Sequence, residues 1–583
     1  MSLGLLSMFF AYGDYTDELF KTYFRHPLIL ALNVLPVVLL LALAYGLFGR
    51  AWPAFLASGV IVLGFSLGNY YKLRFRDDPL MFQDLKNFRD AAGITLEASY
   101  DLTPDKRVWG GLLCLFLGTL FLLFLVRGRL PKRPRIAVTL LAALLCVPMG
   151  RACADDGIYA NKTQNFDFIN RWSSTQLYFS KGFVYPFLHS IGEGGLKAPE
   201  GYRASEAREI LASYTPADLP EERKVDLIFI QLEAFADLSR FDGVEGIDFD
   251  RAYGAYHELE AESYAGNLVT NIFAGGTVNT ERAVLTGYAD QWNYRGNTNS
   301  YGWYLASQGY TAEGSHTSYD WFYNRKNVNR WLGLPTYYFY ENHYNEISEQ
   351  ATAPDNVLMP EIFHLYERNR DGSGGPYFSF NVTYQGHGPY DTEKVWRGNH
   401  FTDGRYSPET ANIVDNYLGS VSDTAEQLQA LADRFRTEDR PVLLVVFGDH
   451  KPWLGYGNSA YHELGVNLNT STREGFYNYY ATRYFLWANG AAKAALGEDF
   501  TGEGPDVSSC FLMNLVFDLC GWQGDAWAQA TTQVWRELPV LTTVGRYVQA
   551  DGRLVETPDE AGQEALRRYQ SIEYYYGTHF QYG

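Results

Sequence analysis

The sequence predicts an α/β protein in which N-terminal transmembrane helices precede a domain built on a mostly parallel central sheet. Long apolar runs are confined to the first 150 residues, and beyond them short apolar runs bounded by charge alternate with helical patterns. The net charge is −19 over 583 residues, and no basic stripe occurs outside the membrane region. This charge distribution argues against a nucleic-acid-binding protein.

Four apolar segments near the N-terminus predict a membrane domain. Residues 27–48, 51–71 and 108–126 each approach the length of about 20 apolar residues that a helix needs to cross a bilayer. A fourth segment, "IAVTLLAALLCVPMG" (136–150), is shorter. We therefore expect about four transmembrane helices within residues 1–150.

The basic residues of the loops predict how the chain is oriented. "RGRLPKRPR" (127–135) carries five basic residues in nine positions, which places this loop in the cytoplasm and the large domain outside the cell. The loop 72–107 disagrees, because it would also lie outside and yet carries seven basic residues. Its charges are diluted by Asp and Glu over a longer stretch, so we give the shorter loop more weight. The expected location is the cell membrane, with several passes.

The remaining chain divides into three further parts. Residues 151–222 form a polar and aromatic extracellular connector in which "STQLYFSKGFVYPFLHSI" (174–191) has a helical pattern. Residues 223–545 form one large domain, and residues 546–583 form a Tyr-rich C-terminal tail.

Three apolar runs predict buried strands. "VDLIFIQLEAF" (225–235), "PYFSFNVTYQGHGPY" (376–390) and "PVLLVVFGDH" (441–450) are continuous rather than alternating, as in parallel strands covered on both faces. Between the last two, residues 408–435 have apolar side chains three to four positions apart, which indicates a helix.

Polar side chains follow each of these strands. Ligands of such sheets gather beyond the carboxyl ends of the strands, where Glu233, His387, Asp449 and His450 occur. Asp449 and His450 offer one hard oxygen and one imidazole nitrogen, a combination suited to Mn²⁺ or Zn²⁺. The alternative is that Glu233 is an ordinary residue at a loop start and that the Asp-His pair is structural.

A fourth candidate comes from "FAGGTVNTERAVLTGY" (273–288), where two glycines precede Thr277 and a helical pattern follows. A hydroxyl at a helix N-terminus lies in positive potential, and metal coordination would lower its pKa enough to make it a nucleophile. The alternative is that Thr277 or Thr280 only caps the helix. Together with Glu233, Asp449 and His450, Thr277 would complete a four-ligand site in which its oxygen is both ligand and attacking atom.

The order of these motifs resembles a known family. The apolar spans, then "IQLEAF", "GGTVNTE", "FYNR", "GHGPY" and "FGDH", are similar to the lipoteichoic acid synthase-like phosphoglycerol transferases of the alkaline phosphatase/sulfatase superfamily. The resemblance covers nearly the whole chain and includes the charged loop "YYKLRFRDDPLMFQDL" (70–85). It implies an alkaline phosphatase/sulfatase-like domain after the membrane helices.

The resemblance also implies roles for individual residues. Glu233, Thr277, Asp449 and His450 match the family's metal ligands, and the metal is usually Mn²⁺, with Mg²⁺ or Zn²⁺ also compatible. Thr277 matches the nucleophile, in preference to Thr280, because it stands four residues before Glu281.

Four further residues are candidates for substrate binding. Arg325 and His387 match contacts to the phosphoglycerol group, and Tyr323 departs from the family pattern, since it stands where the family often has Trp. His316 in "GSHTSYDWF" is a further candidate near the pocket. The alternatives are that Arg325 is a surface ion-pair partner and His387 a loop histidine.

We therefore expect a membrane-anchored, metal-dependent phosphoglycerol transferase. It would move glycerol phosphate from phosphatidylglycerol, through a covalent intermediate on Thr277, to a lipoteichoic-acid-type chain of polyglycerolphosphate, a glycolipid or another glycan.

Other activities are weaker alternatives. Phosphoethanolamine transferases usually carry several disulfides in the outer domain, and only three of the five cysteines lie outside the predicted spans. A sulfatase would need a "CxPxR"-type stretch, which residues 273–288 lack. A catalytically inactive membrane scaffold for cell-envelope polymer assembly has no need of an intact Glu-Thr-Asp-His set.

Overall fold

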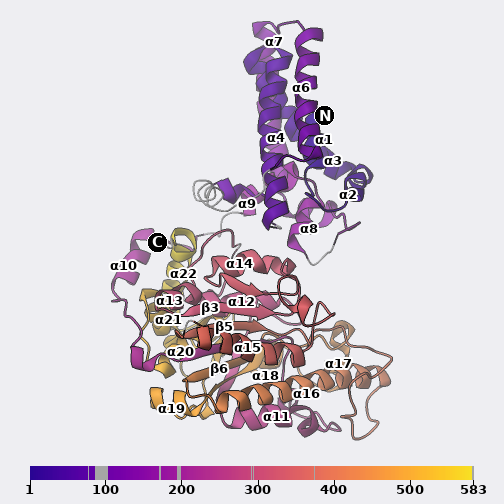
Figure 1. The fold of residues 1–583 in the computed structure, drawn as a ribbon. Coiled ribbons are helices and arrows are strands. Elements are labelled where there is room, and N and C mark those ends of the chain that lie inside the picture. The colour runs from indigo at the N-terminus through magenta and orange to yellow at the C-terminus, as the bar shows by residue number, and fades with distance from the viewer. Residues whose placement is uncertain are drawn as a thin grey trace. The chain divides into compact units, whose positions relative to one another are not determined.

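The computed structural model describes residues 1–76, 78–85, 103–169, 173–193, 198–290, 292, 294–372 and 374–580 (Figure 1). The chain forms two compact units. The first comprises Met1–Leu196 and Trp321–Asn327, and the second comprises Lys197–Asp320 and Val328–Gly583. The domain limits expected from the sequence, at residues 150, 222 and 545, stay a prediction. Part of the basic loop 72–107, residues 86–102, lies outside the described residues.

Among its described residues, the first unit contains four helices that are long and apolar enough to cross a membrane, as the sequence predicts. They are α3 (Pro27–Phe48), α4 (Ala51–Arg76), α6 (Lys106–Leu125) and α7 (Lys132–Cys153). Shorter helices are α1 (Ser2–Phe9), α2 (Glu18–Thr22), α8 (Ser174–Phe179) and α9 (Val184–Glu193).

The expectation of one helix over residues 174–191 is wrong, because α8 and α9 are separated by a break. Gly182 lies in the break with a φ of +90°. The side chain of Asn33 satisfies the freed backbone groups: its Nδ2 donates to Lys181 O at 2.7 Å and its Oδ1 accepts from Phe183 N at 3.1 Å. A Cβ atom on Gly182 would lie 2.5 Å from that side chain, so only glycine fits here.

The second unit is built on a nine-stranded sheet with the order β4-β3-β5-β1-β6-β7-β2-β8, in which β9 also pairs with β2. The pairs of β7 with β6 and with β2 are antiparallel and the others are parallel, which confirms the predicted α/β class with a mostly parallel sheet. The strands are β1 (Asp226–Leu232), β2 (Tyr264–Val269), β3 (Thr311–His316), β4 (Thr336–Tyr338), β5 (Tyr377–Val382), β6 (Val442–Gly448), β7 (Ala481–Ala488), β8 (Gly502–Glu503) and β9 (Val507–Ser508).

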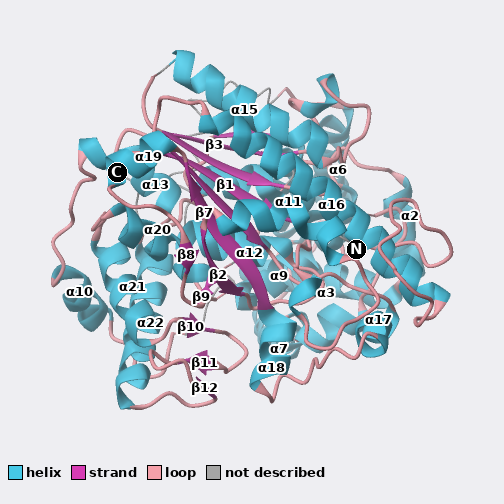
Figure 2. Ribbon diagram, turned by 90° about the horizontal axis from the view of Figure 1, so that it is seen from below, coloured by secondary structure: helices cyan, strands magenta, loops and turns pink. Residues whose placement is uncertain are grey.

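Helices cover both faces of this sheet (Figure 2), which explains the unbroken apolar runs of the central strands. Alternate residues of β1 contribute to different cores: Leu227 and Phe229 to one, Ile228 and Ile230 to the other. The first core includes α12 (Thr277–Thr286), α13 (Tyr301–Ser307), α20 (Leu512–Cys520), α21 (Ala526–Glu537) and α22 (Glu560–His579). The second includes α11 (Phe249–Ala261), α15 (Asp355–Gly372) and α16 (Pro408–Arg436).

The smaller elements complete the second unit. They are α10 (Ala204–Ala212), α14 (Arg325–Trp331, whose first residues belong to the first unit), α17 (Ser459–Glu463), α18 (Arg473–Tyr480), α19 (Gly490–Leu496) and an antiparallel sheet of β10 (Val540–Leu541), β11 (Tyr547–Val548) and β12 (Leu554–Val555).

The register of the central strands brings their carboxyl ends to one edge. Leu232 pairs with Gly448, Gln231 with Val382, and Val382 with His316. The residues that follow these strands therefore emerge side by side.

The C-terminal helix α22 carries a buried carboxyl group. Glu573 is 3% exposed, and its Oε1 accepts hydrogen bonds from Ala289 N at 2.7 Å and Asp290 N at 3.1 Å. Burial raises the pKa of Glu573 to about 8, and the nearby carboxyl of Asp290 adds to the rise.

The ring of Phe229 gives a test of the central packing. It is fully buried, with its centroid 5.6 Å from that of Phe378 and 5.9 Å from that of Phe380. Phe229→Ala is expected to lower the free energy of unfolding by about 3–5 kcal/mol, because it leaves a cavity between the two neighbouring rings. Urea unfolding of the detergent-solubilised chain measures this. Tyr456→Ala, at a side chain that is 89% exposed, is the control and should change stability by less than about 0.5 kcal/mol.

Glu573 predicts a pH dependence of stability. Its pKa is raised from 4.5 to about 8 in the folded chain, so the folded state holds the proton more tightly than the unfolded state does. Its contribution is therefore fully present below pH 4.5 and is lost as the pH rises to about 8. Glu573→Gln keeps the acceptor oxygen and removes the ionisation, so the Tm difference between variant and wild type should shift in favour of the variant between pH 5 and pH 9. A constant Tm difference across this range would contradict the assignment.

Candidate functional site

Glu233, Asp449 and His450 form a buried cluster at the carboxyl edge of the sheet. One ligand atom from each lies within 4.8 Å of the others. His450 Nε2 is 3.7 Å from Glu233 Oε1 and 3.4 Å from Asp449 Oδ2. Glu233 stands 216 positions before Asp449 in the sequence, and the fold brings it next to Asp449 and His450. This proximity is the one expected from "IQLEAF" and "FGDH".

Backbone hydrogen bonds hold the cluster in place. Glu233 N donates to Thr383 Oγ1 at 2.8 Å, and Ala234 N donates to Asp449 Oδ1 at 2.8 Å. His450 Nδ1 is 2.8 Å from Lys451 O. Because a carbonyl oxygen only accepts, Nδ1 carries the proton, and in the neutral ring Nε2 keeps a lone pair available for a metal.

The electrostatics of the cluster favour a bound cation. Burial raises the pKa of Asp449 to about 7, with the carboxylate of Glu233 adding to the rise and His450 opposing it. Burial disfavours the protonation of His450, but the charges of Asp449 and Glu233 outweigh this effect and raise its pKa. Within the described part of the chain, the buried atoms Asp449 Oδ2 and His450 Nε2 have no hydrogen-bond partner. Two carboxylates and an imidazole with such atoms left over fit a divalent metal ion.

Thr277 lies beside the cluster at the first position of α12. Gly276 precedes it with a φ of +89°, and the Thr277 hydroxyl donates to Glu233 Oε2 at 2.9 Å. Its carbonyl oxygen accepts from Gln231 Nε2 at 3.2 Å. The N-cap of α12 is Gly276, which has no side chain, and the hydroxyl of Thr277 points to Glu233 of the cluster.

Thr280 has a different position. Its hydroxyl donates to the carbonyl oxygen of Asp449 at 2.8 Å, and therefore ties α12 to the loop that carries Asp449 and His450. The sequence offered Thr280 as an alternative cap and as a less favoured nucleophile; it did not predict this contact, because segments 169 positions apart leave no local pattern.

A row of rings extends from the same edge. His316 ends β3, is 2% exposed, and has its Nδ1 2.9 Å from Val382 O. Its ring centroid is 6.3 Å from that of Tyr384, and Tyr384 stacks on the exposed ring of His387 at 4.9 Å. A Cβ atom on Gly386 would lie 2.0 Å from Glu233 O, so the backbone before His387 contacts the backbone of Glu233. Sequence reasoning found both histidines but missed Tyr384 and Gly386.

Arg325 and Tyr323 belong to the first unit, in the segment Trp321–Asn327. Arg325 is 2% exposed, and its guanidinium carbon lies 5.5 Å from the centroid of the Tyr323 ring. Tyr323 and Asn324 both have a φ of 57°, and Asn324 Nδ2 donates to Asp78 Oδ1 at 3.3 Å. The substrate contacts expected of Arg325 and Tyr323 stay predictions.

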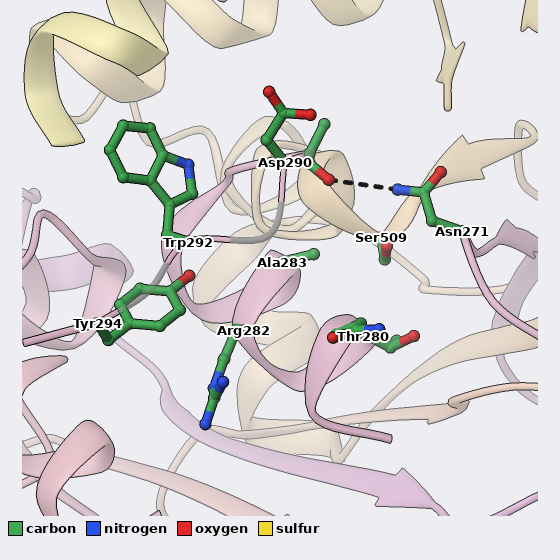
Figure 3. Close-up of a pocket in the computed structure, with 10 residues that line it drawn as sticks. Asn271, Thr280, Arg282, Ala283, Asp290, Trp292, Tyr294 and Ser509 are labelled. Carbon is green, nitrogen blue, oxygen red and sulfur yellow. Dashed lines mark hydrogen bonds between the residues drawn. The ribbon is translucent and has the colours of Figure 1, made fainter. Parts of the chain in front are cut away.

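A separate cavity of about 50 Å³ adjoins α12 (Figure 3). Asn271 closes one side of it by donating from Nδ2 to Ala289 O at 3.4 Å. Thr277 and the Glu233 cluster do not line it. The lining residues are Asn271, Asn279, Thr280, Arg282, Ala283, Ala289, Asp290, Trp292, Tyr294 and Ser509.

Comparison with known sequences finds a relative in Rhizobium meliloti (strain 1021), described as a "Putative cyclic beta-1,2-glucan modification protein". It is 28% identical over 315 residues, which cover 52% of this chain and 47% of the relative. The match thus spans about half the length of the relative.

Solved structures with a similar fold include two transferases and a synthase. The phosphoglycerol transferase GacH of Streptococcus pyogenes is 17% identical, with a TM-score of 0.48 and coverage of 65% of this chain and 95% of that chain. The lipoteichoic acid synthase LtaP of Listeria monocytogenes is 17% identical, with a TM-score of 0.46 and coverage of 64% and 97%. The lipooligosaccharide phosphoethanolamine transferase EptA of Neisseria meningitidis is 11% identical, with a TM-score of 0.35 and coverage of 91% and 98%. At such scores these likenesses do not determine the reaction of this chain.

The family match is more informative. The sequence model of the sulfatase family matches residues 227–521, just over half of the chain. The matched region contains Glu233, Thr277, Asp449 and His450, the four residues that meet at the carboxyl edge of the sheet. The chain therefore belongs to the sulfatase family.

Proposed function

We propose that this protein is a membrane-anchored, metal-dependent phosphoglycerol transferase with Thr277 as its nucleophile. The observation that carries the proposal is the hydrogen bond of 2.9 Å from the Thr277 hydroxyl to Glu233 Oε2, beside the buried carboxylate and imidazole of Asp449 and His450. A buried threonine hydroxyl at a helix start has no structural need for two carboxylates and a histidine around it. These groups suit phosphoryl transfer, in which positioning and charge neutralisation dominate.

Glu233, Asp449, His450 and Thr277 Oγ1 would hold the metal. A divalent ion bound there lowers the pKa of the threonine hydroxyl and neutralises charge on the phosphoryl group. The three side chains with oxygen ligands and the single imidazole favour Mn²⁺, with Mg²⁺ and Zn²⁺ as alternatives.

The first half of the reaction transfers the phosphoglycerol group to Thr277. Thr277 Oγ1 attacks the phosphorus of phosphatidylglycerol and loses its proton toward Glu233 Oε2. The bond from phosphorus to the diacylglycerol oxygen breaks, and this oxygen takes up the proton released by Thr277, so that diacylglycerol leaves as the alcohol. The product is glycerophospho-threonine.

The second half releases the group to an acceptor. An acceptor hydroxyl forms the new oxygen–phosphorus bond, the Thr277 Oγ1–phosphorus bond breaks, and the acceptor's proton is lost while Thr277 regains one. His387 would bind a phosphate oxygen or move this proton. The ring of Tyr384 lies between His387 and His316 and contacts both. Arg325 would bind the phosphoryl oxygens, and Tyr323 would orient Arg325.

A glycan is the acceptor that we favour over a polyglycerolphosphate chain or a glycolipid. The description of the Rhizobium meliloti relative names the modification of a cyclic glucan, which supports this choice. The four apolar helices and the basic loop 127–135 support a multi-pass protein whose catalytic unit faces outward and takes its lipid from the outer leaflet.

Removal of the Thr277 hydroxyl tests the nucleophile. Thr277→Ala in the full-length chain should lower diacylglycerol release by at least about a thousandfold, because it removes the oxygen that forms the covalent intermediate. Fluorescent phosphatidylglycerol in vesicles with Mn²⁺ reports this release. Thr437→Ala, at an exposed threonine, is the control and should stay within about twofold of wild type.

The same assay can also give results that would contradict the proposed function. Full activity in Thr277→Ala would refute the nucleophile. Turnover of phosphatidylethanolamine without turnover of phosphatidylglycerol would replace the proposal by phosphoethanolamine transfer, and inactivity toward both lipids without bound metal would leave a scaffold.

Metal binding can be tested without an activity assay. Asp449→Asn should weaken Mn²⁺ binding by at least about a hundredfold, because it removes the charged oxygen of a buried ligand. Electron paramagnetic resonance of free Mn²⁺ during titration of the detergent-solubilised chain measures the affinity. Asp403→Asn, at an exposed ion pair with Arg405, is the matched control and should bind as wild type does. Equal affinities of the two variants would exclude the Asp449 site.

A further inference from the structure

A cavity of about 580 Å³ opens beside His387, on the loop that follows β5. Its size suits one or two sugar rings rather than a single small ion. The residues that line it are His387, Pro389, Tyr390, Asp391, Thr392, Glu393, Trp396, Arg397, Asn416 and Ser420, all of which belong to the second unit.

Backbone contacts connect this cavity to the active site. Tyr390, in its wall, donates its hydroxyl to Gly386 O at 2.6 Å, and Gly386 lies against the carbonyl of Glu233. The ring of Tyr390 also packs on the ring of Tyr417, with 5.5 Å between their centroids. The hydroxyl of Tyr417 in turn accepts a hydrogen bond from Ala236 N at 2.8 Å. The wall of the cavity is therefore fixed to the loop that carries Glu233.

Trp396 provides an exposed aromatic surface at the cavity. It is 67% exposed, which costs hydrophobic free energy unless a ligand covers the ring. Its orientation is nevertheless fixed, because Trp396 N donates to Asn416 Oδ1 at 2.7 Å and its indole Nε1 donates to Asp391 Oδ2 at 2.8 Å. Lys394 Nζ lies 3.4 Å from the ring centroid, so one face is covered and the other remains for a ligand.

The charges around the cavity argue against an anionic ligand. Hydrogen bonds from Glu393 N, the Trp396 indole and Lys394 N lower the pKa of Asp391, which is therefore ionised at neutral pH. Glu393 adds a second carboxylate, the ammonium of Lys394 is held on one face of the Trp396 ring, and the guanidinium of Arg397 is already paired with Asp423. Carboxylates and an amide beside an aromatic ring are groups that accept hydrogen bonds from hydroxyls and pack against C–H bonds.

We propose that this cavity binds the acceptor, and that the acceptor is a neutral glycan which stacks a sugar ring on Trp396 and presents a hydroxyl near His387. The proposal rests on the phosphoglycerol transferase function and specifies its acceptor. A polyglycerolphosphate chain would place phosphates beside Asp391 and Glu393, and the resulting repulsion disfavours it.

Binding is measured with the full-length protein in detergent and without lipid donor, so that transfer chemistry plays no part. The probes are a neutral cyclic β-1,2-glucan and a short polyglycerolphosphate, each titrated by isothermal calorimetry. The wild type should bind the glucan and bind the polyglycerolphosphate at least about tenfold more weakly. Trp396→Ala should weaken glucan binding by about tenfold, and Trp396→Phe, which keeps a ring, by less than about threefold.

Val395→Ala is the matched control, since it lies on the same loop and does not line the cavity. It should bind the glucan as wild type does, and circular dichroism should show all three variants folded. Unchanged glucan binding in Trp396→Ala, or preference for polyglycerolphosphate, would overturn the site. Glucan binding that depends on Trp396, in a chain that releases no diacylglycerol from phosphatidylglycerol, would instead refute the proposed function and leave the glycan site standing.

Discussion

The parallel pairing of β1 with both β5 and β6 is the constraint on which the site depends. The pairs Gln231–Val382 and Leu232–Gly448 fix where each strand stops, so Glu233, Thr383 and Asp449 emerge at one edge. A shift of one residue in either pairing would turn every side chain of a strand to the opposite face. The two apolar cores prevent such a shift, because β1 contributes alternate residues to each of them. The burial that stabilises the sheet thus also sets the geometry of the cluster.

Burial has a second effect at this edge. Two carboxylates and an imidazole that would be unremarkable in water are held where unpaired charge is costly. Asp449 Oδ2 and His450 Nε2, without hydrogen-bond partners among the described residues, show this cost directly. An arrangement with this cost persists only when the surrounding structure enforces it, and here the backbone directly after β1 and the hydroxyls of Thr280 and Thr383 do so.

Much of this arrangement is predictable from the sequence, for a physical reason. Buried parallel strands have unbroken apolar runs, and a polar residue that ends such a run stands out, as Glu233, Asp449 and His450 do. Thr277 stands out because two glycines precede a helical pattern. The positions of Gly182 and Gly386 and the contact that Thr280 makes were not recognised, because each depends on a partner far along the chain: Asn33, the Glu233 backbone and the Asp449 loop. Pairings of this kind leave no periodicity to read.

The segment Trp321–Asn327 limits how the catalytic unit can be separated from the membrane helices. It lies within the sequence of the catalytic unit but packs with the first unit, and its Asn324 is held by Asp78, which in turn pairs with Lys72 at 2.6 Å. A soluble fragment that starts after the membrane helices would keep the seven residues of this segment and lose their packing partners. The membrane part is therefore not an interchangeable tether: a chimera with foreign helices would inherit the nucleophile and the metal ligands intact, but would leave Arg325 without the scaffold that shapes its loop.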